Sequence, residues 1–464
     1  MTERGFANGD RGFSGLVLSG LTFAVLTFGC QMNKHDSERV AGMFESLGAL
    51  QVPDVEEADI VVYLTCCVRE SAETRLYGQV SSIKNIPLRE SSPLGKRIIA
   101  IGGCIGQNSA GALLDELPFV DVVFGTFNLG SLPMLVQSAL ESGASQVEVL
   151  DAASDFPTSL PSHREHHWSA WLPISIGCDN FCTYCIVPHV RGREKSRPFD
   201  EVVAEAHMLV EQGVQEITLL GQNVNSYGRD LYGAPRFADL LHRVSETGVA
   251  RIRFATSHPK DITDEVIDAF RTLPNVMPAI HLPVQSGSNR ILECMNRRYT
   301  KEHYLERIAK LRAARPDIAL STDIIVGFPG ETEQDFQDTF DLVDQVGYSQ
   351  VFTFIFSPRE GTPAANYPDD TPHEVVQRRF ERLVDLVQER AHQANQSDVG
   401  SVVDVLVEGP SKRDPSILSG RSPKNQTVHA RMPEGATIEE LRGRIVPVRI
   451  DQARTWYLRG ELVD

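Results

Sequence analysis

The chain has 464 residues, of which 41% are hydrophobic and 23% are charged, a composition typical of folded globular domains. This length corresponds to about two to four domains. The formal net charge of −17 excludes a generally basic surface, so any RNA contact must be a local patch. Eight cysteines are too few for a disulfide scaffold. The sequence also has no apolar run of the about 18 residues that a membrane span needs.

Residues 13–30 are apolar and follow two arginines, as in a secretory signal peptide. Asp10 weakens the positive segment, and Phe28 is bulky where a cleavage site needs small residues. We therefore expect residues 1–19 to be a disordered tail and the segment ending at Cys30 to be a buried strand. An exported lipoprotein attached through Cys30 is the alternative.

Three apolar segments of strand length each end at cysteine, and a helix-like segment follows each of them. The cysteines are Cys30, Cys66 (followed by Cys67) and Cys104. Strand–helix alternation predicts a parallel sheet. Because the carboxyl ends of parallel strands face one crevice, we expect these cysteines to converge. Asp36 or Ser37 is the expected N-cap of the helix after Cys30.

The rest of the chain predicts two further domains. After a polar, proline-containing segment, six βα-like units predict a partial or full (β/α) barrel, closed by a long helix. From about residue 398, short strands with Gly/Pro turns predict a small all-β barrel of OB-like size. We thus expect an α/β protein with an N-terminal parallel α/β domain at 20–140, a linker at 141–163, a barrel domain at 164–396 and a small β-barrel at 397–464.

The sharpest motif is Cys178-Asp-Asn-Phe-Cys182-Thr-Tyr-Cys185. Three thiolates on one turn suit a [4Fe–4S] cluster whose fourth iron stays open to a chelating small molecule. A structural zinc site with His189 or His207 as fourth ligand is the alternative.

This motif, with the aromatic Tyr184 before its last cysteine, resembles the signature of radical S-adenosylmethionine enzymes. The resemblance extends over nearly the whole chain to the radical S-adenosylmethionine methylthiotransferase family. The N-terminal part carries Gly29-Cys-Gln-Met-Asn33 and Gly102-Gly-Cys104, and the central part carries Leu220-Gly-Gln-Asn-Val-Asn225. Leu418-Ser-Gly-Arg421 looks like the TRAM RNA-binding domain. Gln31-Met32 is most similar to the MiaB-type branch, which modifies tRNA, because ribosomal-protein methylthiotransferases usually carry Pro-Lys there.

The resemblance implies two [4Fe–4S] clusters and S-adenosyl-L-methionine as cofactors. Its ligand sets are Cys30, Cys66 and Cys104 for an auxiliary cluster, and Cys178, Cys182 and Cys185 for the S-adenosylmethionine cluster. Cys67 departs from the family, which usually has a small residue there, and the spacing from Thr65 favours Cys66 as the ligand. Leu64 replaces a common Asn. Cys294 is expected to pack on a helix as a small hydrophobic residue.

The implied reaction is methylthiolation at C2 of N6-isopentenyladenosine next to the anticodon in tRNA. A 5′-deoxyadenosyl radical would abstract hydrogen from C2, and a methylthio group from the auxiliary cluster would be inserted. The implied product is 2-methylthio-N6-isopentenyladenosine. No catalytic residue is assigned beyond the cluster ligands, and no general base is assigned. Methylthiolation of another modified adenosine or of a ribosomal protein, or a non-catalytic iron–sulfur RNA-binding protein, are the alternatives.

We expect a cytoplasmic enzyme, because the reducing cytosol suits labile clusters and thiols. We also expect it to be a monomer and not to contact the membrane. A low-potential donor such as flavodoxin or ferredoxin is expected to supply electrons. The sulfur source is left open.

Several residues at the ends of barrel strands are candidate contacts of S-adenosylmethionine, with ordinary βα turns as the alternative. They are Tyr184, Gly221, Gln222, Asn223, Asp323 and Gly327. His281 and Gln285 are expected to face the same end of the barrel.

RNA contacts are expected from a basic run just beyond the cluster loop, Arg191, Arg193 and Lys195, and from Arg421. A solvated, partly ion-paired loop is the alternative for the basic run. Residues 397–464 hold ten basic and ten acidic residues, so this segment is basic relative to the whole chain. We expect Trp456 to lie in the core of the small barrel.

Overall fold

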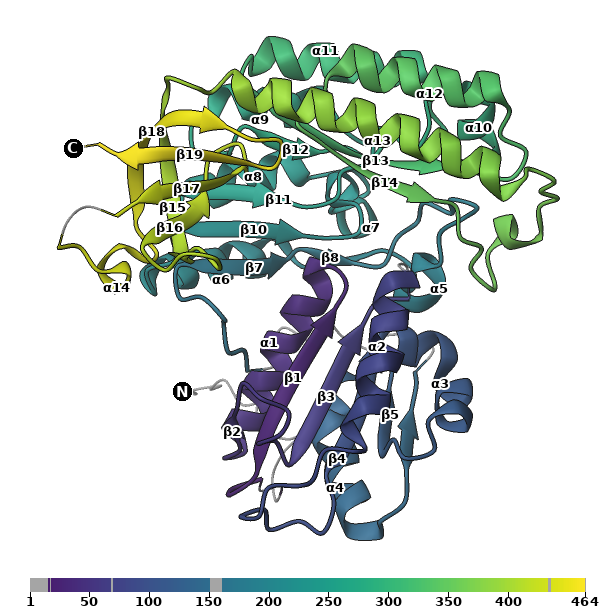
Figure 1. The fold of residues 1–464 in the computed structure, drawn as a ribbon, viewed down its shortest axis with the longest axis vertical. Coiled ribbons are helices and arrows are strands. Elements are labelled where there is room, and N and C mark those ends of the chain that lie inside the picture. Colours follow the sequence, from purple (N-terminus) through teal and green to yellow (C-terminus); the bar gives the residue numbers. More distant parts are fainter. Residues whose placement is uncertain (1–15, 17, 68–69, 151–160, 433–434, 464) are drawn as a thin grey trace, which may run out of the picture. The chain divides into compact units, whose positions relative to one another are not determined.

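The computed structural model describes residues 16, 18–67, 70–150, 161–432 and 435–463. The expected tail at 1–19 falls mostly outside the described residues, but Leu18 is buried in the core. The chain divides into two compact units, drawn in Figure 1. The first unit holds residues up to 165 together with 177–179 and 186–193, and the second holds the other residues.

The first unit is built on a parallel sheet of six strands in the order β2-β1-β3-β4-β5-β6. The central strands are buried on both faces, which explains their continuous runs of Ile, Val and Leu. The strands are β1 (Thr22–Phe28), β2 (Leu50–Gln51), β3 (Ile60–Thr65), β4 (Ile98–Gly103), β5 (Val122–Phe124) and β6 (Gln146–Glu148).

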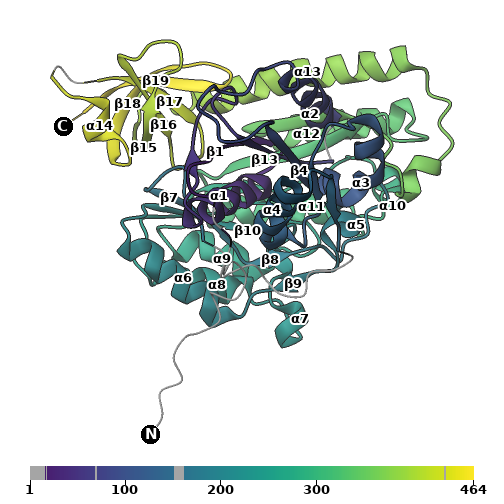
Figure 2. The same ribbon diagram turned by 90° about the horizontal axis from the view of Figure 1, so that it is seen from below.

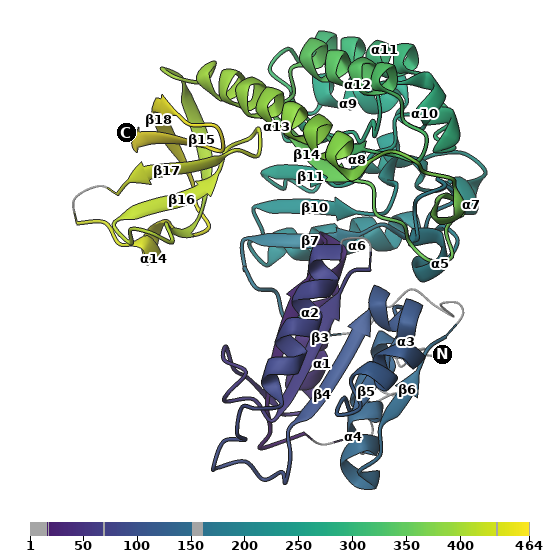
Figure 3. The same ribbon diagram turned by 45° about the vertical axis from the view of Figure 1, so that its right-hand side comes forward.

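Helices cover both faces of this sheet (Figure 3). Helices α1 (Gln31–Ser46) and α4 (Leu132–Ser142) pack on one face, and α2 (Glu70–Ile83) and α3 (Cys104–Glu116) pack on the other. The short η1 (Leu129–Ser131) precedes α4, and α5 (Val187–Arg191) lies against α3. The predicted parallel α/β domain is confirmed.

Two details of this domain differ from the sequence analysis. Helix α1 begins at Gln31 with Cys30 as its N-cap, so neither Asp36 nor Ser37 caps it. The sheet also extends beyond residue 140, because β6 pairs with β5 from Val122↔Gln146 to Phe124↔Glu148. A three-residue strand carries too little pattern to be predicted from the sequence alone.

The second unit contains six parallel barrel strands in two groups of three, with the orders β11-β10-β7 and β12-β13-β14. A parallel bridge joins Ile252 of β11 to Val276, and one continuous hydrophobic core runs under both groups. This is the predicted partial (β/α) barrel. The strands are β7 (Ser169–Pro173), β10 (Glu216–Leu220), β11 (Arg251–Phe254), β12 (Ala279–His281), β13 (Ala319–Val326) and β14 (Gln350–Ile355).

Amphipathic helices cover the outer face of the barrel strands, and α13 leads from them into the C-terminal strands (Figure 2). The larger helices are α6 (Phe199–Glu211), α8 (Phe237–Ser245), α9 (Asp264–Thr272), α11 (Lys301–Ala314), α12 (Glu333–Val346) and α13 (His373–Gln396). Smaller elements are the hairpin of β8 (Ser175–Ile176) and β9 (Lys195–Ser196), α7 (Arg229–Tyr232), α10 (Asn289–Cys294), η2 (Val224–Ser226) and η3 (Pro363–Asn366).

The C-terminal segment forms a closed barrel in the order β15-β16-β17-β19-β18, as predicted. Its elements are β15 (Val402–Pro410), β16 (Ile417–Arg421), β17 (Thr427–Arg431), α14 (Ile438–Leu441), β18 (Ile445–Ala453) and β19 (Tyr457–Leu462). Within the second unit, two arginines at the start of β11 hold this barrel. Arg251 donates to the carbonyls of Arg421 (2.9 Å) and Asp404 (2.7 Å), and Arg253 donates to that of Ser422 (2.8 Å).

Candidate active site

The three N-terminal cysteines meet at the carboxyl edge of the parallel sheet. Strands β1, β3 and β4 are aligned so that Phe28 pairs with Thr65, which pairs with Gly103. The Cys66 thiol contacts the thiols of both Cys30 and Cys104. Aligned parallel strands thus bring together side chains that are far apart in the sequence.

Glycine precedes two of these cysteines for a steric reason. A Cβ on Gly29 would lie 2.6 Å from Cβ of Cys66, and a Cβ on Gly103 would lie 2.9 Å from the carbonyl oxygen of Thr65. Both residues also have positive φ, +138° and +85°. Only glycine allows the strand ends to turn this sharply and approach this closely.

The electrostatics of the thiols favour the thiolate form that iron binds. The hydrogen bond with Cys66 lowers the pKa of Cys30 to about 6; burial opposes this shift and the charge of Arg191 adds to it. Hydrogen bonds with Cys66 and Cys67 place the pKa of Cys104 well below its usual value, again helped by Arg191. Because Cys66 acts as the donor, its own pKa is raised. Thiolate is the form in which cysteine ligates metals.

The surroundings of these thiols fit a sulfur-rich inorganic group. Among the described residues, Nδ2 of Asn33 and Oγ1 of Thr65 are buried and have no hydrogen-bond partner. Both belong to residues that adjoin the cysteines, since Cys30 Sγ contacts Asn33 Oδ1 at 3.4 Å and Thr65 precedes Cys66. Buried polar atoms normally have partners, and the sulfides of a cluster would supply them.

Cys66 and Cys67 have different contacts in the structure. Cys66 lies between Cys30 and Cys104, whereas Cys67 contacts Cys104 and packs with the apolar Ile186 and Val190. This arrangement supports Cys66 as the ligand, in line with the spacing argument from the sequence.

The second cysteine motif follows the barrel strand β7 and the short β8. Cys178 belongs to the first unit, where its backbone N–H donates to the carbonyl of Gly192 (3.1 Å). Cys182 and Cys185 belong to the second unit, where the N–H of Cys185 donates to the Cys182 carbonyl (3.0 Å). That the three close on one cluster stays a prediction. Across the described residues, no group of three or more His, Cys, Asp or Glu side chains is arranged to hold a single metal ion.

A group of buried polar atoms without partners lies at the carboxyl ends of β10 and β11. Thr256, next to Ser257, and Gln285, which follows β12 and pairs with Ile324 of β13, have positive φ, +66° and +71°, a strained conformation for residues other than glycine. Such strain and unsatisfied polarity together are typical of a ligand site. Within the described part of the chain these atoms are Oγ of Ser175, Oε1 of Gln222, Oδ1 of Asn223, Nδ2 of Asn225, Oγ of Ser257 and Nε2 of His258.

The predicted cofactor residues are distributed unevenly with respect to this group. Gln222 and Asn223 belong to it, and Gly221 adjoins it because a Cβ there would lie 2.6 Å from Oγ of Ser175. Asp323 instead pairs with His281, at 3.4 Å between Oδ2 and Nε2. Gly327 packs against Val376 of α13, where a Cβ would approach to 2.5 Å. In this structure Gly327 therefore contacts helix α13.

His258, which was not among the residues predicted from the sequence, lies in the Thr-Ser-His-Pro segment after β11. This imidazole is 7% exposed and stacks edge-on against Tyr299, at 5.6 Å between ring centroids. Burial and the charges of Arg297 and Lys260 hold its pKa well below the usual value, so it is neutral at physiological pH. The polar Thr-Ser-His-Pro segment that follows strand β11 is the signal that could have identified it.

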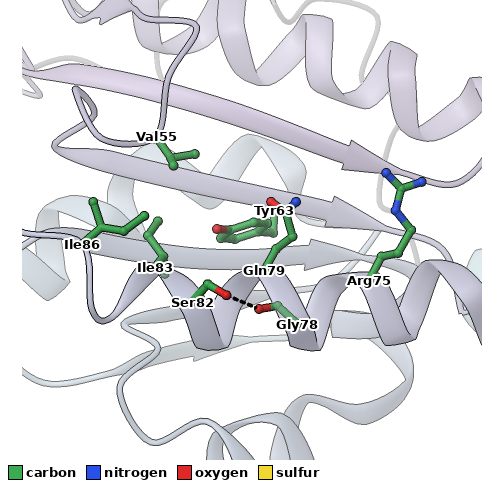
Figure 4. Close-up of a pocket in the computed structure, with 8 residues that line it drawn as sticks. All are labelled: Val55, Tyr63, Arg75, Gly78, Gln79, Ser82, Ile83 and Ile86. Carbon is green, nitrogen blue, oxygen red and sulfur yellow. Dashed lines mark hydrogen bonds between the residues drawn. The ribbon is translucent and has the colours of Figure 1, made fainter.

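A separate hollow of about 390 Å³ lies between α2 and β3 in the first unit (Figure 4). Arg75 stands at one end of it and Ile86 at the other, and none of its lining residues is a predicted cluster ligand. The lining residues are Val55, Tyr63, Arg75, Gly78, Gln79, Ser82, Ile83 and Ile86.

Comparisons with known proteins identify the family. The Radical SAM superfamily matches residues 172–343, Uncharacterized protein family UPF0004 matches 22–125, and the TRAM domain matches 396–463. The tRNA-2-methylthio-N(6)-dimethylallyladenosine synthase of Acidothermus cellulolyticus is 48% identical over 436 residues, which are 93% of this chain and 86% of that protein. The chain belongs to this synthase family. The synthase of a Thermoanaerobacter species is 46% identical over 96% of this chain and 93% of its own length.

Solved structures agree on the architecture. The radical S-adenosylmethionine methyltransferase TsrM from Kitasatospora setae superimposes with a TM-score of 0.53 over 75% of this chain and 74% of that chain. At 13% sequence identity, this likeness shows the fold alone. As a radical SAM member of the synthase family, the protein uses S-adenosyl-L-methionine and [4Fe–4S] clusters.

The four arginine and lysine residues predicted to bind RNA differ in exposure. Arg193 is exposed and pairs with Asp179 (2.6 Å), Lys195 is exposed in β9, and Arg421 is partly exposed near Glu408 (3.4 Å). Arg191, however, is 7% exposed and donates to Asp36 Oδ2 (2.9 Å) and Asn33 Oδ1 (3.3 Å). The expectation that Arg191 contacts phosphates does not suit this buried position beside thiolates and a carboxylate.

Replacing Arg191 with Gln should therefore destabilise the protein without weakening tRNA binding. The change leaves the Asp36 carboxylate without its buried guanidinium partner, which costs about 3 kcal/mol. Arg193→Gln, which breaks an exposed pair, should cost less than about 1 kcal/mol. Thermal unfolding of the two variants measures the difference, and equal stability losses would contradict this placement of Arg191.

The outer face of the small barrel carries aromatic and cationic side chains. Trp456 is 53% exposed at the turn between β18 and β19, so the expectation that it lies in the core was wrong. Buried Leu458, one residue beyond Tyr457, fills the interior instead. On β17 and β19, His429 and Tyr457 contact each other at 5.2 Å between ring centroids, and Arg459 lies over the Tyr457 ring.

Proposed function

We propose that the protein adds a methylthio group to C2 of N6-isopentenyladenosine next to the anticodon in tRNA, giving 2-methylthio-N6-isopentenyladenosine. The contact of Cys30, Cys66 and Cys104 thiols at one sheet edge carries this proposal, because a second three-thiol site is what sulfur insertion requires beyond radical formation. Relatives 46–48% identical over nearly the whole chain are named as synthases of the corresponding modification.

We assign Cys178, Cys182 and Cys185 to the S-adenosylmethionine cluster and Cys30, Cys66 and Cys104 to the auxiliary cluster. When bound, these groups together supply a carbon-centred radical and a methylthio group. An aromatic C–H bond offers no proton that ordinary side chains could remove, which is why such cofactors are needed.

The chain's own residues then bind and orient S-adenosylmethionine and exclude water from the site. The unpartnered atoms of Asn223, Asn225 and Ser257 offer donors and acceptors to the polar groups of S-adenosylmethionine. The neutral His258 offers a hydrogen-bonding nitrogen that adds no charge to the site. The buried strand ends exclude water, which would quench a reactive radical.

The target adenine has to leave its stack to reach the site, as for other base-modifying enzymes. We propose that the outer face of the small barrel, with Trp456, Tyr457 and Arg421, holds the RNA nearby. Stacking on aromatic side chains tolerates different bases, and Arg421 suits phosphates.

Trp456→Ala should weaken tRNA binding about tenfold, because loss of one stacked base costs about 1–3 kcal/mol. Met208→Ala is the control, since it removes a similarly exposed side chain (48%) from helix α6. Filter binding with unmodified and isopentenylated tRNA measures both. Equal affinities of the Trp456→Ala variant and the unaltered protein would show that this face does not hold RNA.

Electrons are proposed to come from a low-potential donor such as flavodoxin or ferredoxin, and the protein is proposed to be a cytoplasmic monomer. The eight cysteines, all within the described residues, form no disulfides, which suits a reducing compartment. Among the helices that the structure describes, none combines the length and apolar character needed to cross a bilayer.

Mass spectrometry of tRNA nucleosides tests the function. Anaerobically reconstituted protein is incubated with isopentenylated tRNA, S-adenosylmethionine, sulfide and a reductant. We expect 2-methylthio-N6-isopentenyladenosine together with 5′-deoxyadenosine. Deoxyadenosine without the methylthio product would indicate a different substrate, and the absence of both would favour a non-catalytic iron–sulfur protein.

A further inference from the structure

One buried arginine contacts the S-adenosylmethionine cluster loop, and the assigned function gives it no role. Arg297 lies in the turn between α10 and α11 and is 5% exposed. Its Nη1 donates to Sγ of Cys182 and to the hydroxyl of Tyr184, each at 3.4 Å. Its other nitrogens are held by the Pro283 carbonyl (2.7 Å) and the Tyr299 hydroxyl (3.0 Å). The guanidinium therefore has a fixed orientation toward the thiol.

The turn that carries Arg297 also holds the cluster loop by its backbone. The N–H of Thr183 donates to the Met295 carbonyl (3.1 Å), and the Thr183 hydroxyl donates to that of Cys294 (2.9 Å). Asn296 donates to the carbonyl of Phe181 (2.7 Å). Asn296 and Arg298, which flank Arg297, have φ values of +56° and +58°, a strained conformation at both neighbours.

The charge of Arg297 is directed at the thiol. Among the described residues its contacts are two hydroxyls, one carbonyl and the Cys182 sulfur, and none is a carboxylate. Arg191, by contrast, is balanced by Asp36. A buried cation is costly to keep unless an anion compensates it, and a ligating thiolate is such an anion.

We propose that Arg297 is a positioning residue that orients Cys182 and raises the reduction potential of the S-adenosylmethionine cluster. This rests on the assignment of Cys182 as a ligand. One electron passes from the low-potential donor to the cluster, no bond forms or breaks, and the cluster gains one negative charge. A nearby cation and an N–H···S hydrogen bond stabilise that more negative state more than the oxidised one.

A redox titration of Arg297→Gln tests the proposal. Iron content is measured first, and reduction is then followed by electron paramagnetic resonance, selecting the signal that changes when S-adenosylmethionine is added. We expect at least tenfold less reduced cluster at a fixed donor potential, equivalent to a midpoint about 59 mV lower. Arg298→Gln, which removes the same charge from the exposed neighbouring residue, should titrate like the unaltered protein. A fully loaded Arg297→Gln variant with an unaltered midpoint would overturn the proposal.

A second measurement needs no variant. Protein with isotopically labelled arginine nitrogen should show coupling between that nitrogen and the reduced, S-adenosylmethionine-responsive cluster. Absence of this coupling would overturn the proposal even if Arg297→Gln failed to hold iron. Both readouts are independent of the methylthio product, so failure of this inference is distinguishable from failure of the proposed function.

Discussion

Replacing Cys66 with alanine should abolish methylthiolation while leaving S-adenosylmethionine cleavage intact. The Cys66 thiol contacts both Cys30 and Cys104, so its loss leaves two thiols where a four-iron cluster needs three. Iron should fall from about eight to about four per chain. Iron analysis, deoxyadenosine formation and nucleoside mass spectrometry on the same sample measure the three effects.

Cys67→Ala is the matched control for this variant, because it removes a thiol from the neighbouring residue. Cys67 packs against Ile186 and Val190. Its replacement should therefore cost only the packing energy of a small buried side chain. It should keep about eight irons and full activity. If Cys67→Ala lost the cluster and Cys66→Ala kept it, the ligand assignment at this strand end would have to be exchanged.

Replacing Arg251 with alanine should destabilise the docking of the C-terminal barrel on the radical SAM core. The change removes the guanidinium donors of the Arg421 and Asp404 carbonyls, and a hydrogen bond from a charged group contributes about 1.5–3 kcal/mol. Burial lowers the pKa of Arg251 to about 10, so the guanidinium is charged at neutral pH and its hydrogen bonds are charge-assisted. We expect a loss of about 3 kcal/mol, faster proteolysis near residue 397 and weaker tRNA binding.

Arg243→Ala is the control for this loss of charge. Arg243 is half-exposed on α8 and pairs with Glu246 three residues along the helix, a contact worth less than about 1 kcal/mol. Limited proteolysis and thermal unfolding compare the two variants. Equal resistance to proteolysis would mean that the covalent link through α13 alone keeps the barrel in place.

The features that the sequence predicts well are those set by repetition. Apolar runs that end in cysteine predict parallel strands, and the parallel register then brings Cys30, Cys66 and Cys104 together. The closed C-terminal barrel follows in the same way from short strands separated by Gly/Pro turns.

The features that the sequence does not predict depend on the tertiary partners of single side chains. Arginine is usually exposed, so the basic run gave no sign that Arg191 is buried against Asp36 while Arg193 faces solvent. Trp456 was expected in the core because a small barrel needs aromatic side chains there, but its position in the turn leaves it half-exposed. The role of Arg297 depends on a fold that brings the residue near Cys182, 115 positions earlier in the chain.

The contacts of Arg251 and Arg253 with the C-terminal barrel reach main-chain oxygens. Main-chain oxygens are present whatever side chains a barrel carries, so this attachment constrains the shape of the module and not its amino-acid identities. The surface that meets nucleic acid can therefore differ between relatives without weakening these hydrogen bonds. A barrel exchanged between two synthases should dock on its new host and bring its own preference for RNA with it.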